Sequence, residues 1–181
     1  TEEQIICLVK KAYEEGLQIR VRGATHSIAH AIYTDPAKDK EHVPNKISIE
    51  EPPEGPNINL MLDKYRKLVW EDEKGGIVVV DSGIHLNVDP HDPTGTSTKE
   101  NGLLYQIFQK GFGFSDLGGI TQQTVSGFLM TGSAGGSMMY DLAENILGFK
   151  IVDGTGDCRW INKDDEIFPA VSLSLGLLGI I

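Results

Sequence analysis

Leu117 to Ser137, LGGITQQTVSGFLMTGSAGGS, is the segment that says most about the fold of this chain. It concentrates small hydroxyl residues together with the glycines Gly118, Gly119, Gly127, Gly132, Gly135 and Gly136. Glycine has no Cβ and tolerates positive φ, so such a run favours a backbone that wraps a phosphate or a flat ring with its N–H groups. A set of ordinary turns is the alternative, because the chain has 21 glycines in 181 residues, above the usual ~7 %.

A second small-residue loop lies upstream and favours the ligand interpretation. Arg20 to Ser27 reads RVRGATHS. From Leu17 to Arg22, apolar residues alternate with polar ones, which predicts a half-buried strand that runs directly into this loop. The two loops together indicate one ligand held from two sides.

Composition places the chain among soluble globular proteins with one full domain. Hydrophobic residues make up 40 % of it, and the formal net charge is -10 without a basic stripe, which argues against nucleic acid as a partner. Cys7 and Cys158 form neither a disulfide framework nor a metal-ligand spacing. No apolar run approaches the ~20 residues of a membrane span. The first residues, TEEQ, lack the basic and apolar blocks of a signal peptide, and the compartment stays open.

Mixed helices and strands surround the two loops. Thr1 and Gln4 fit a capping box, and a helix follows whose apolar face ends before Gly16. That face consists of Ile5, Leu8, Val9, Ala12 and Tyr13. Further strands are expected at 58–62 and 76–80, and a second helix is expected from 102 to 110 with a stop at Gly111.

Two polar excursions interrupt this pattern, at Thr34 to Pro56, with at most a short strand at 46–49, and at Asn87 to Asn101. Near the end, Asp153 to Gly156 predicts a hairpin between strands at 149–152 and 158–161. A helix is expected to start at 166–169, and 177–181 reads as an apolar strand. An intact domain rarely stops on such a run, which predicts a truncated protein.

Four segments, in order, resemble a known family. They are RVRGATHS, GGIVVVDSGI, FSDLGGITQQTVSGFLMTGSAGGS and FKIVDGTGDCRWINKDDEIFPAVSLSLGLLGII. The set is similar to the FAD-binding domain of the vanillyl-alcohol oxidase and p-cresol methylhydroxylase superfamily, above all to its sugar-lactone (aldonolactone) and alditol oxidases. The resemblance implies an α+β domain of two subdomains with FAD between them. The first, about 1–75, carries the pyrophosphate loop; the second, about 76–181, is incomplete before a missing C-terminal substrate domain.

The resemblance also implies which residues contact the flavin. The first loop would cover the pyrophosphate with backbone amides, a role that suits small residues. The matching positions are Arg22, Gly23, Ala24, Thr25, His26, Ser27, Gly119, Thr124, Gly127, Thr131, Gly132, Ser133, Ala134, Ile180 and Ile181. Arg20 and Arg22 either add positive potential to this site or are solvent-facing residues on one face of the strand.

His26 matches the histidine that many such relatives bond covalently to the flavin 8α-methyl group. The alternative is a loop histidine that caps a turn or hydrogen-bonds the cofactor. A second, cysteine linkage is not expected, because the glycine segment contains no cysteine. Ala134 stands where the sugar oxidases often have a histidine, so the resemblance specifies the cofactor more closely than the substrate.

Two other groups of residues give weaker indications of a site. His85, Asp89 and His91 are of metal-ligating types, but Pro90 and the irregular spacing fit a polar loop better, so no metal site is predicted. Serines, histidine and aspartates are present for a hydrolase triad, yet the chain has no GxSxG nucleophile elbow.

The function implied by the resemblance is oxidation of a sugar, sugar lactone or related alcohol, with hydride transfer to flavin N5. No catalytic residue is assigned, because relatives supply the base mainly from the substrate domain, and the fragment alone is expected to be nearly inactive. The electron acceptor and oligomeric state stay open. The alternative is a non-catalytic module that keeps the flavin fold for binding or assembly in a larger complex.

Overall fold

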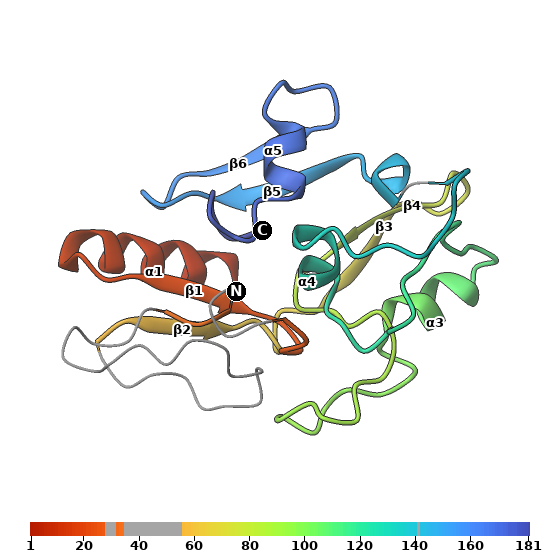
Figure 1. Cartoon of the computed structure of the whole chain (residues 1–181), viewed down its shortest axis with the longest axis horizontal. Coiled ribbons are helices and arrows are strands. Elements are labelled where there is room, and N and C mark those ends of the chain that lie inside the picture. The colour runs from red at the N-terminus through yellow and green to blue at the C-terminus, as the bar shows by residue number, and fades with distance from the viewer. Residues whose placement is uncertain (28–31, 35–55, 141) are drawn as a thin grey trace.

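A computed structural model describes residues 1–27, 32–34, 56–140 and 142–181 (Figure 1). The short strand expected at 46–49 lies outside the described residues. The helices are α1 (Glu2–Glu15), α3 (Leu103–Phe108), α4 (Val125–Met130), the 3-10 helix η1 (Leu142–Asn145) and α5 (Phe168–Ser172). The strands are β1 (Ile19–Arg22), β2 (Ile58–Met61), β3 (Leu68–Asp72), β4 (Ile77–Val80), β5 (Gly148–Val152) and β6 (Cys158–Asn162).

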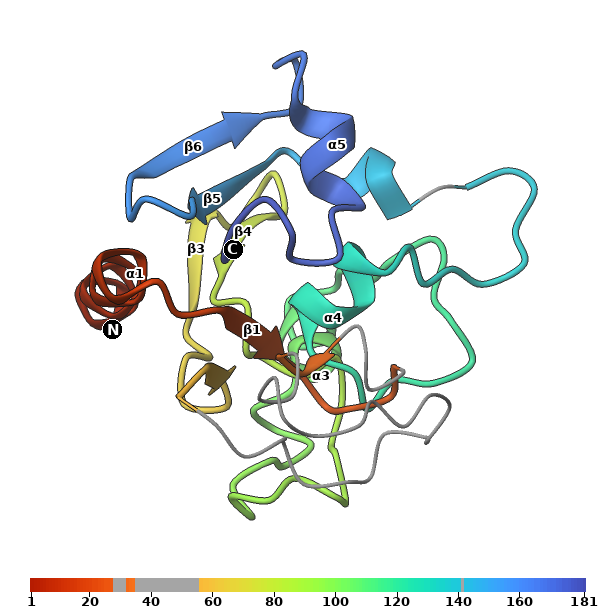
Figure 2. The same ribbon diagram turned by 60° about the vertical axis from the view of Figure 1, so that its left-hand side comes forward.

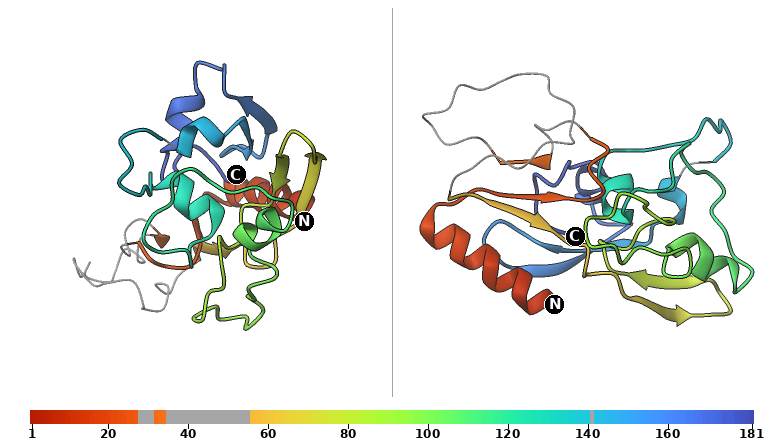
Figure 3. Two further views of the ribbon diagram at one scale, coloured as in Figure 1. Left: turned by 90° about the vertical axis from the view of Figure 1, so that its right-hand side faces the viewer. Right: turned by 90° about the horizontal axis from the view of Figure 1, so that it is seen from below.

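The strands form three pairs. β1 pairs with β2 in parallel, whereas β3 with β4 and β5 with β6 are antiparallel. Helix α1 lies beside the β1–β2 pair, as Figures 1 and 3 show. Helix α5 lies against the β5–β6 hairpin, and α3 lies beside β3 and β4 at the other end of the molecule (Figure 1). The mixed α+β class expected from the sequence is confirmed.

Local sequence signals set the ends of the first helix. The Thr1 hydroxyl accepts from the Gln4 N–H and the Gln4 side chain accepts from the Thr1 amine, which completes the predicted capping box. Gly16 ends the helix with φ 65°. The predicted apolar face is correct at Ile5, Val9 and Ala12, which are buried, but wrong at Tyr13, whose surface is 66 % exposed. Tyr13 lies at the edge of the apolar stripe, where no second layer covers it.

The hairpin β5–β6 also follows from its turn. The Asp153 carboxylate accepts from the N–H groups of Thr155 and Asp157 and from the Thr155 hydroxyl, and Gly156 has φ 86°. The strand expected at 177–181 is wrong as a strand. There the chain makes one isolated antiparallel bridge, between Ile180 and Val152, because glycines with positive φ at 176 and 179 bend it.

Three clusters of buried apolar side chains form the core. One joins Ile84 and Leu86 to α3 and α4, and a second packs α5 and Met130 on the β5–β6 hairpin. The third contains Ile5, Val9, Leu62, Val152 and Ile180, so α1 shares a core with the last residues of the chain. Both predicted subdomains contribute to this cluster, and their boundary near residue 75 stays a prediction. No helix within the described residues is long and apolar enough to cross a membrane.

The polar loop at 87–101 is organised around Asp92. Its carboxylate accepts from the N–H groups of Thr94, Thr96 and Ser97 and from the Thr94 hydroxyl. Partial burial raises the pKa of this carboxyl, but the hydrogen bonds from Thr94, Ser97 and Thr96 outweigh it and lower the pKa to about 2. Arg66 ties the loop to the body by donating to Thr96.

We expect Asp92→Asn to lower the free energy of unfolding at pH 7 by on the order of 1–2 kcal/mol, discounted for solvent screening. The folded-state pKa is depressed, so this stabilisation is present above the unfolded pKa of about 3.9 and is lost as pH falls through about 2. Denaturant unfolding at pH 7 and at pH 2 measures it. The exposed Asp164→Asn is the control, and an equal deficit of Asp92→Asn at both pH values contradicts the assignment.

Candidate functional site

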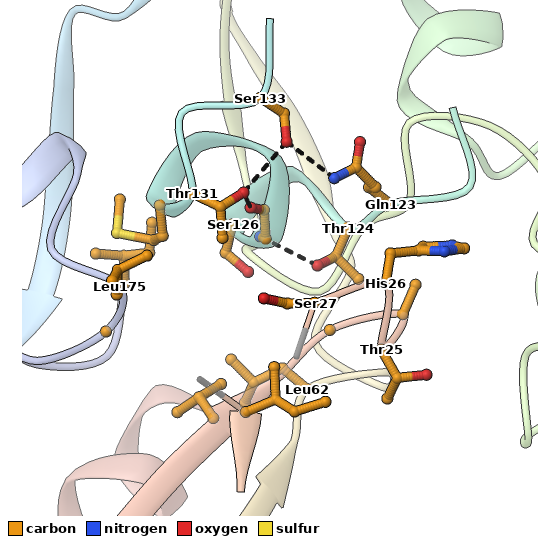
Figure 4. Close-up of a pocket in the computed structure, with 18 of the residues that line it drawn as sticks. Thr25, His26, Ser27, Leu62, Gln123, Thr124, Ser126, Thr131, Ser133 and Leu175 are labelled. Atoms are coloured by element: carbon orange, nitrogen blue, oxygen red, sulfur yellow. Dashed lines mark hydrogen bonds between the residues drawn. The ribbon is translucent and has the colours of Figure 1, made fainter. Parts of the chain in front are cut away.

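A cleft of about 210 Å3 lies where three segments meet. The first is the loop that follows β1, at 23–27; the second runs from 123 to 133 and includes α4; the third runs from 175 to 181. Figure 4 shows Ser27 between the Thr124–Ser126 side and Leu62, with Leu175 across the opening. The two small-residue loops singled out in the sequence therefore line one cavity.

The first two loops approach each other at Gly23 and Thr124. A Cβ added at Gly23 would lie 2.2 Å from Thr124 Oγ1, so only glycine permits this contact. Thr124 is 4 % exposed and caps α4 by accepting from the Gly127 N–H at 3.2 Å. The position of the first loop is thus set directly by the residue that starts α4.

His85 supports the second loop from behind. Its Nδ1 lies 2.7 Å from the Gln122 carbonyl oxygen, and its backbone forms an isolated antiparallel bridge with Thr124. The neighbouring Leu86 N–H donates to the Gln123 carbonyl at 2.8 Å. Asp89 Oδ2 is 3.9 Å from His85 Nδ1, and no group of three metal-ligating side chains gathers within the described part of the chain. Buried His85 therefore holds the backbone that leads into the cleft.

A chain of hydroxyl and amide groups fixes the far side of α4. The Thr131 hydroxyl donates to the Gly127 carbonyl at 2.8 Å and lies 3.2 Å from the Ser133 hydroxyl. The Gln123 amide donates to that same Ser133 hydroxyl at 3.0 Å (Figure 4). These side chains order the loop after α4 and present polar atoms along the cleft wall.

Unusual backbone conformations concentrate around the cleft. Thr25 and Leu175 are the non-glycine residues with positive φ in the described chain, at 59° and 53°, and both line the cleft. A side chain in this region costs of order 1–3 kcal/mol, and such strain is typical of ligand-binding segments. Gly179 lines the cleft as well, and a Cβ there would lie 2.4 Å from the Val152 carbonyl.

Most of the predicted contact residues line this cleft. They are Gly23, Ala24, Thr25, His26, Ser27, Thr124, Gly127, Thr131, Ser133, Ile180 and Ile181. The structure leaves Arg22, Gly119, Gly132 and Ala134 out of its lining. Whether any of these residues contacts a flavin stays a prediction.

Sequence reasoning missed several lining residues: Val21, Ile32, Leu62, Gln123, Ser126, Met130, Leu175, Gly176 and Gly179. Gln123 and Ser126 lie inside the glycine segment. A helix predicted to start at the Thr124 cap would have indicated that Ser126, in its first turn, lines the same cleft as Thr124. Leu62 and Met130 are ordinary buried apolar residues whose sequence carries no signal for a site.

The cleft is electrically almost neutral. Among the described residues that line it, only His26 has an ionisable side chain, and that side chain is exposed. In Figure 4 the His26 ring extends outward, on the side of Ser27 away from Leu175. Small polar groups, main chain and apolar side chains therefore define what this cleft can bind.

Comparisons with known proteins agree on one relationship. No family model matches the chain. D-arabinono-1,4-lactone oxidase of Saccharomyces cerevisiae is 36 % identical over 133 residues, which cover 68 % of this chain and 22 % of that protein. The Yarrowia lipolytica protein of the same name is 36 % identical over 186 residues, covering 99 % of this chain and 29 % of that protein. The chain thus spans less than a third of the length of these relatives.

The fold agrees as well. 6-Hydroxy-D-nicotine oxidase of Arthrobacter nicotinovorans superposes on 99 % of this chain with a TM-score of 0.69 at 18 % identity, and the match covers 33 % of that structure. The ordered sequence motifs, this fold and the lactone oxidase relatives show that the chain belongs to the vanillyl-alcohol oxidase and p-cresol methylhydroxylase superfamily, in the neighbourhood of the aldonolactone oxidases.

Proposed function

We propose that this chain is the FAD-binding part of an oxidoreductase that oxidises a sugar lactone, sugar or related alcohol. The proposal rests on one observation: both small-residue loops line the same cleft. The relatives named D-arabinono-1,4-lactone oxidase support the substrate class. The catalytic activity and the substrate are proposed for the whole protein, because this chain spans less than a third of the length of these relatives.

The size and chemistry of the cleft fit a part of the cofactor. Whole ligands usually occupy about 300–1,000 Å3, so a cleft of about 210 Å3 encloses one portion of an extended dinucleotide. The absence of a side chain at Gly23 lets the main chain of the first loop lie directly against Thr124 at the start of α4. Backbone N–H groups and hydroxyls can accommodate a pyrophosphate without cations. We assign this portion to the pyrophosphate and its neighbouring atoms.

Each wall has its own task in this proposal. The loop at 23–27 covers the phosphates, while Ser126 and Thr131 present hydroxyls from α4 and its end. Leu62, Leu175 and Met130 close the opposite side and exclude water. Bound FAD supplies the acceptor of a hydride at its N5. The catalytic base is not assigned to any residue of this chain.

His26 is proposed to bond the flavin covalently. Its side chain is exposed at the rim, and its ring extends away from the enclosed part of the cleft (Figure 4). With the pyrophosphate in the enclosed cleft, the flavin ring would lie outside it, on the side that the His26 ring faces. The strained Thr25 backbone immediately before it supports a positioned histidine over a freely moving loop residue.

Flavin titration tests the proposed function. We expect the chain to bind FAD with quenched flavin fluorescence and absorbance near ~450 nm. FMN is the matched control, since it lacks the adenylate and the pyrophosphate bridge, and we expect it to bind at least about tenfold more weakly. Equal affinity for FMN and FAD contradicts the pyrophosphate assignment. A chain that binds neither flavin supports a non-catalytic module.

A further inference from the structure

His85 is a buried polar side chain that lies behind one wall of the cleft without lining it. It stands between Ile84 and Leu86, which both belong to a buried apolar cluster. A ring nitrogen in such surroundings needs a hydrogen-bond partner. The partner is the Gln122 carbonyl oxygen, 2.7 Å from Nδ1. Because a carbonyl only accepts, the hydrogen of the neutral ring lies on Nδ1.

Asp89 favours the same position of that hydrogen. The residue is 5 % exposed, and its Oδ2 lies 3.9 Å from His85 Nδ1. Its Oδ1 accepts from the His91 N–H at 2.9 Å, which holds the carboxylate beside the ring. A negative charge near Nδ1 stabilises an N–H there over a lone pair. The imidazole is therefore set up as a donor toward Gln122.

This donor adds a side chain to a series of main-chain hydrogen bonds. The carbonyls of Thr121 and Gln123 accept from the N–H groups of Asn87 and Leu86, at 2.7 and 2.8 Å. The carbonyl between them, that of Gln122, accepts from the imidazole. Three consecutive carbonyls are thus held by one neighbouring segment. The orientation of the peptide that precedes Gln123 depends on the middle bond, which only a side chain supplies.

The two residues after that peptide carry polar groups into the cleft. The Gln123 amide donates to the Ser133 hydroxyl at 3.0 Å, and the Thr124 hydroxyl accepts from the Gly127 N–H at 3.2 Å (Figure 4). Both side chains line the cleft. A rotation of the peptide before Gln123 would therefore displace two parts of the cleft wall at once.

The main chain of His85 is anchored on its other side by α3. The N–H groups of Leu103 and Leu104, in the first turn of α3, donate to the carbonyls of His85 and Leu86, both at 2.9 Å. In Figure 2, α4 lies close to α3 and to the end of β1, and both helices contribute to one apolar cluster. The imidazole thus projects from a fixed point toward the loop that leads into α4.

We propose that His85 is a positioning residue for cofactor binding, whose Nδ1–H sets the direction in which Gln123 and Thr124 enter the cleft. The inference rests on the proposed function for its effect on FAD, whereas its effect on the loop rests on the hydrogen bonds alone. The competing role for His85 is to fill space in the core. The two roles make opposite demands on a replacement, because filling space needs volume and positioning needs a donor at the place of Nδ1.

His85→Asn and His85→Gln separate these roles. Asparagine is smaller than histidine but can place an amide N–H where Nδ1 stands, whereas glutamine keeps more of the volume and carries its donor one carbon farther out. His85→Leu removes the donor, and His91→Asn is the control at an exposed histidine outside the cleft. FAD affinity is measured by titration in the His26→Asn background, where no covalent bond forms.

NMR supplies two readouts that do not need FAD. The ring 15N resonances of His85 report which nitrogen carries the hydrogen. Amide hydrogen exchange at Gly127 reports the cap made by Thr124. It is compared with exchange at the buried β5 residue Ile151, which reports the stability of the chain as a whole.

We expect the FAD affinity of His85→Asn to stay within about threefold of the parent, and that of His85→Gln and His85→Leu to fall by at least roughly tenfold. Exchange at Gly127 relative to Ile151 should speed up in the same order. Tighter FAD binding by His85→Gln than by His85→Asn overturns the proposal, and so does equal binding by all three variants. A hydrogen on Nε2 of the parent ring removes its premise.

The proposed function fails separately from this inference. Absence of FAD binding in every chain, the parent included, contradicts the proposed function. Exchange at Gly127 then still decides the role of His85 in the loop: faster relative exchange in His85→Gln than in His85→Asn supports it, and unchanged relative exchange in all variants refutes it.

Discussion

Gly23→Ala is expected to weaken FAD binding by roughly 10- to 100-fold, which corresponds to an overpacking cost of about 1–3 kcal/mol. The added methyl would lie 2.2 Å from Thr124 Oγ1 and 3.3 Å from Thr124 Cβ. Thr124 cannot simply rotate, because its hydroxyl caps α4 and a β-branched side chain has few rotamers. The two loops must move apart, and with them the walls of the cleft. Isothermal titration with FAD in the His26→Asn background, where binding stays reversible, measures the loss.

A double-mutant cycle separates this clash from a general loss of stability. Thr124→Ala alone removes the cap and should cost about 1 kcal/mol of stability. In that background, the further effect of Gly23→Ala on FAD affinity should fall below about threefold, because the clashing oxygen is gone. Gly136→Ala is the control in the glycine segment, since a Cβ there meets no atom within 4 Å. A Gly23→Ala chain that binds FAD normally refutes the loop-contact role.

Much of the fold could be predicted where local chemistry decides it. The capping box of Thr1, the stop at Gly16 and the turn at Asp153 each fix an element end within a few residues. The two cleft loops were predicted for a similar reason, since runs of small residues mark close backbone approach. Gly23 shows why: its conformation is ordinary, and the requirement comes from its neighbour Thr124.

Elements that depend on distant partners could not be predicted. Strand β3 was missed because its few apolar residues sit among charges, and it is held by pairing with β4. Helix α4 was missed because it is short and contains Gly127; the Thr124 cap and burial of Phe128 stabilise it. Such helices owe their stability to tertiary packing, which propensity does not record.

The cleft shows the same division. The composition of the two small-residue loops was enough to predict its first two walls. The third wall, at Leu175 to Gly179, depends on positive φ angles that no local sequence pattern predicted. Arg22 is a flavin-contacting position only by the resemblance; it is the last residue of β1 and lies outside the lining of this cleft, so its contact with the cofactor stays a prediction.

His26→Ala is expected to release the flavin when the chain is denatured, whereas the wild-type chain is expected to retain it. A covalent bond survives unfolding, whereas non-covalent contacts in the cleft do not. Joining an imidazole nitrogen to the 8α-methyl carbon would remove two protons and two electrons; the flavin would take up the electrons, and dissolved oxygen would then reoxidise it. After incubation with FAD in air and acid precipitation, nearly all colour should stay in the wild-type pellet and nearly none in that of His26→Ala.

His91→Ala is the matched control, because His91 is also exposed but belongs to the Asp92 loop outside the cleft. His26→Asn keeps a hydrogen-bonding side chain and should also release the flavin, since an amide forms no such bond. Both His26 variants should still bind FAD reversibly, because the hydroxyls of Thr124, Ser126 and Thr131 and the loop backbone are unchanged. Flavin in the supernatant of the wild-type chain ends the covalent assignment and leaves the cleft intact. Loss of reversible binding in His26→Asn instead shows that His26 contributes to non-covalent FAD binding. The exposed position of His26 at the rim argues against that outcome.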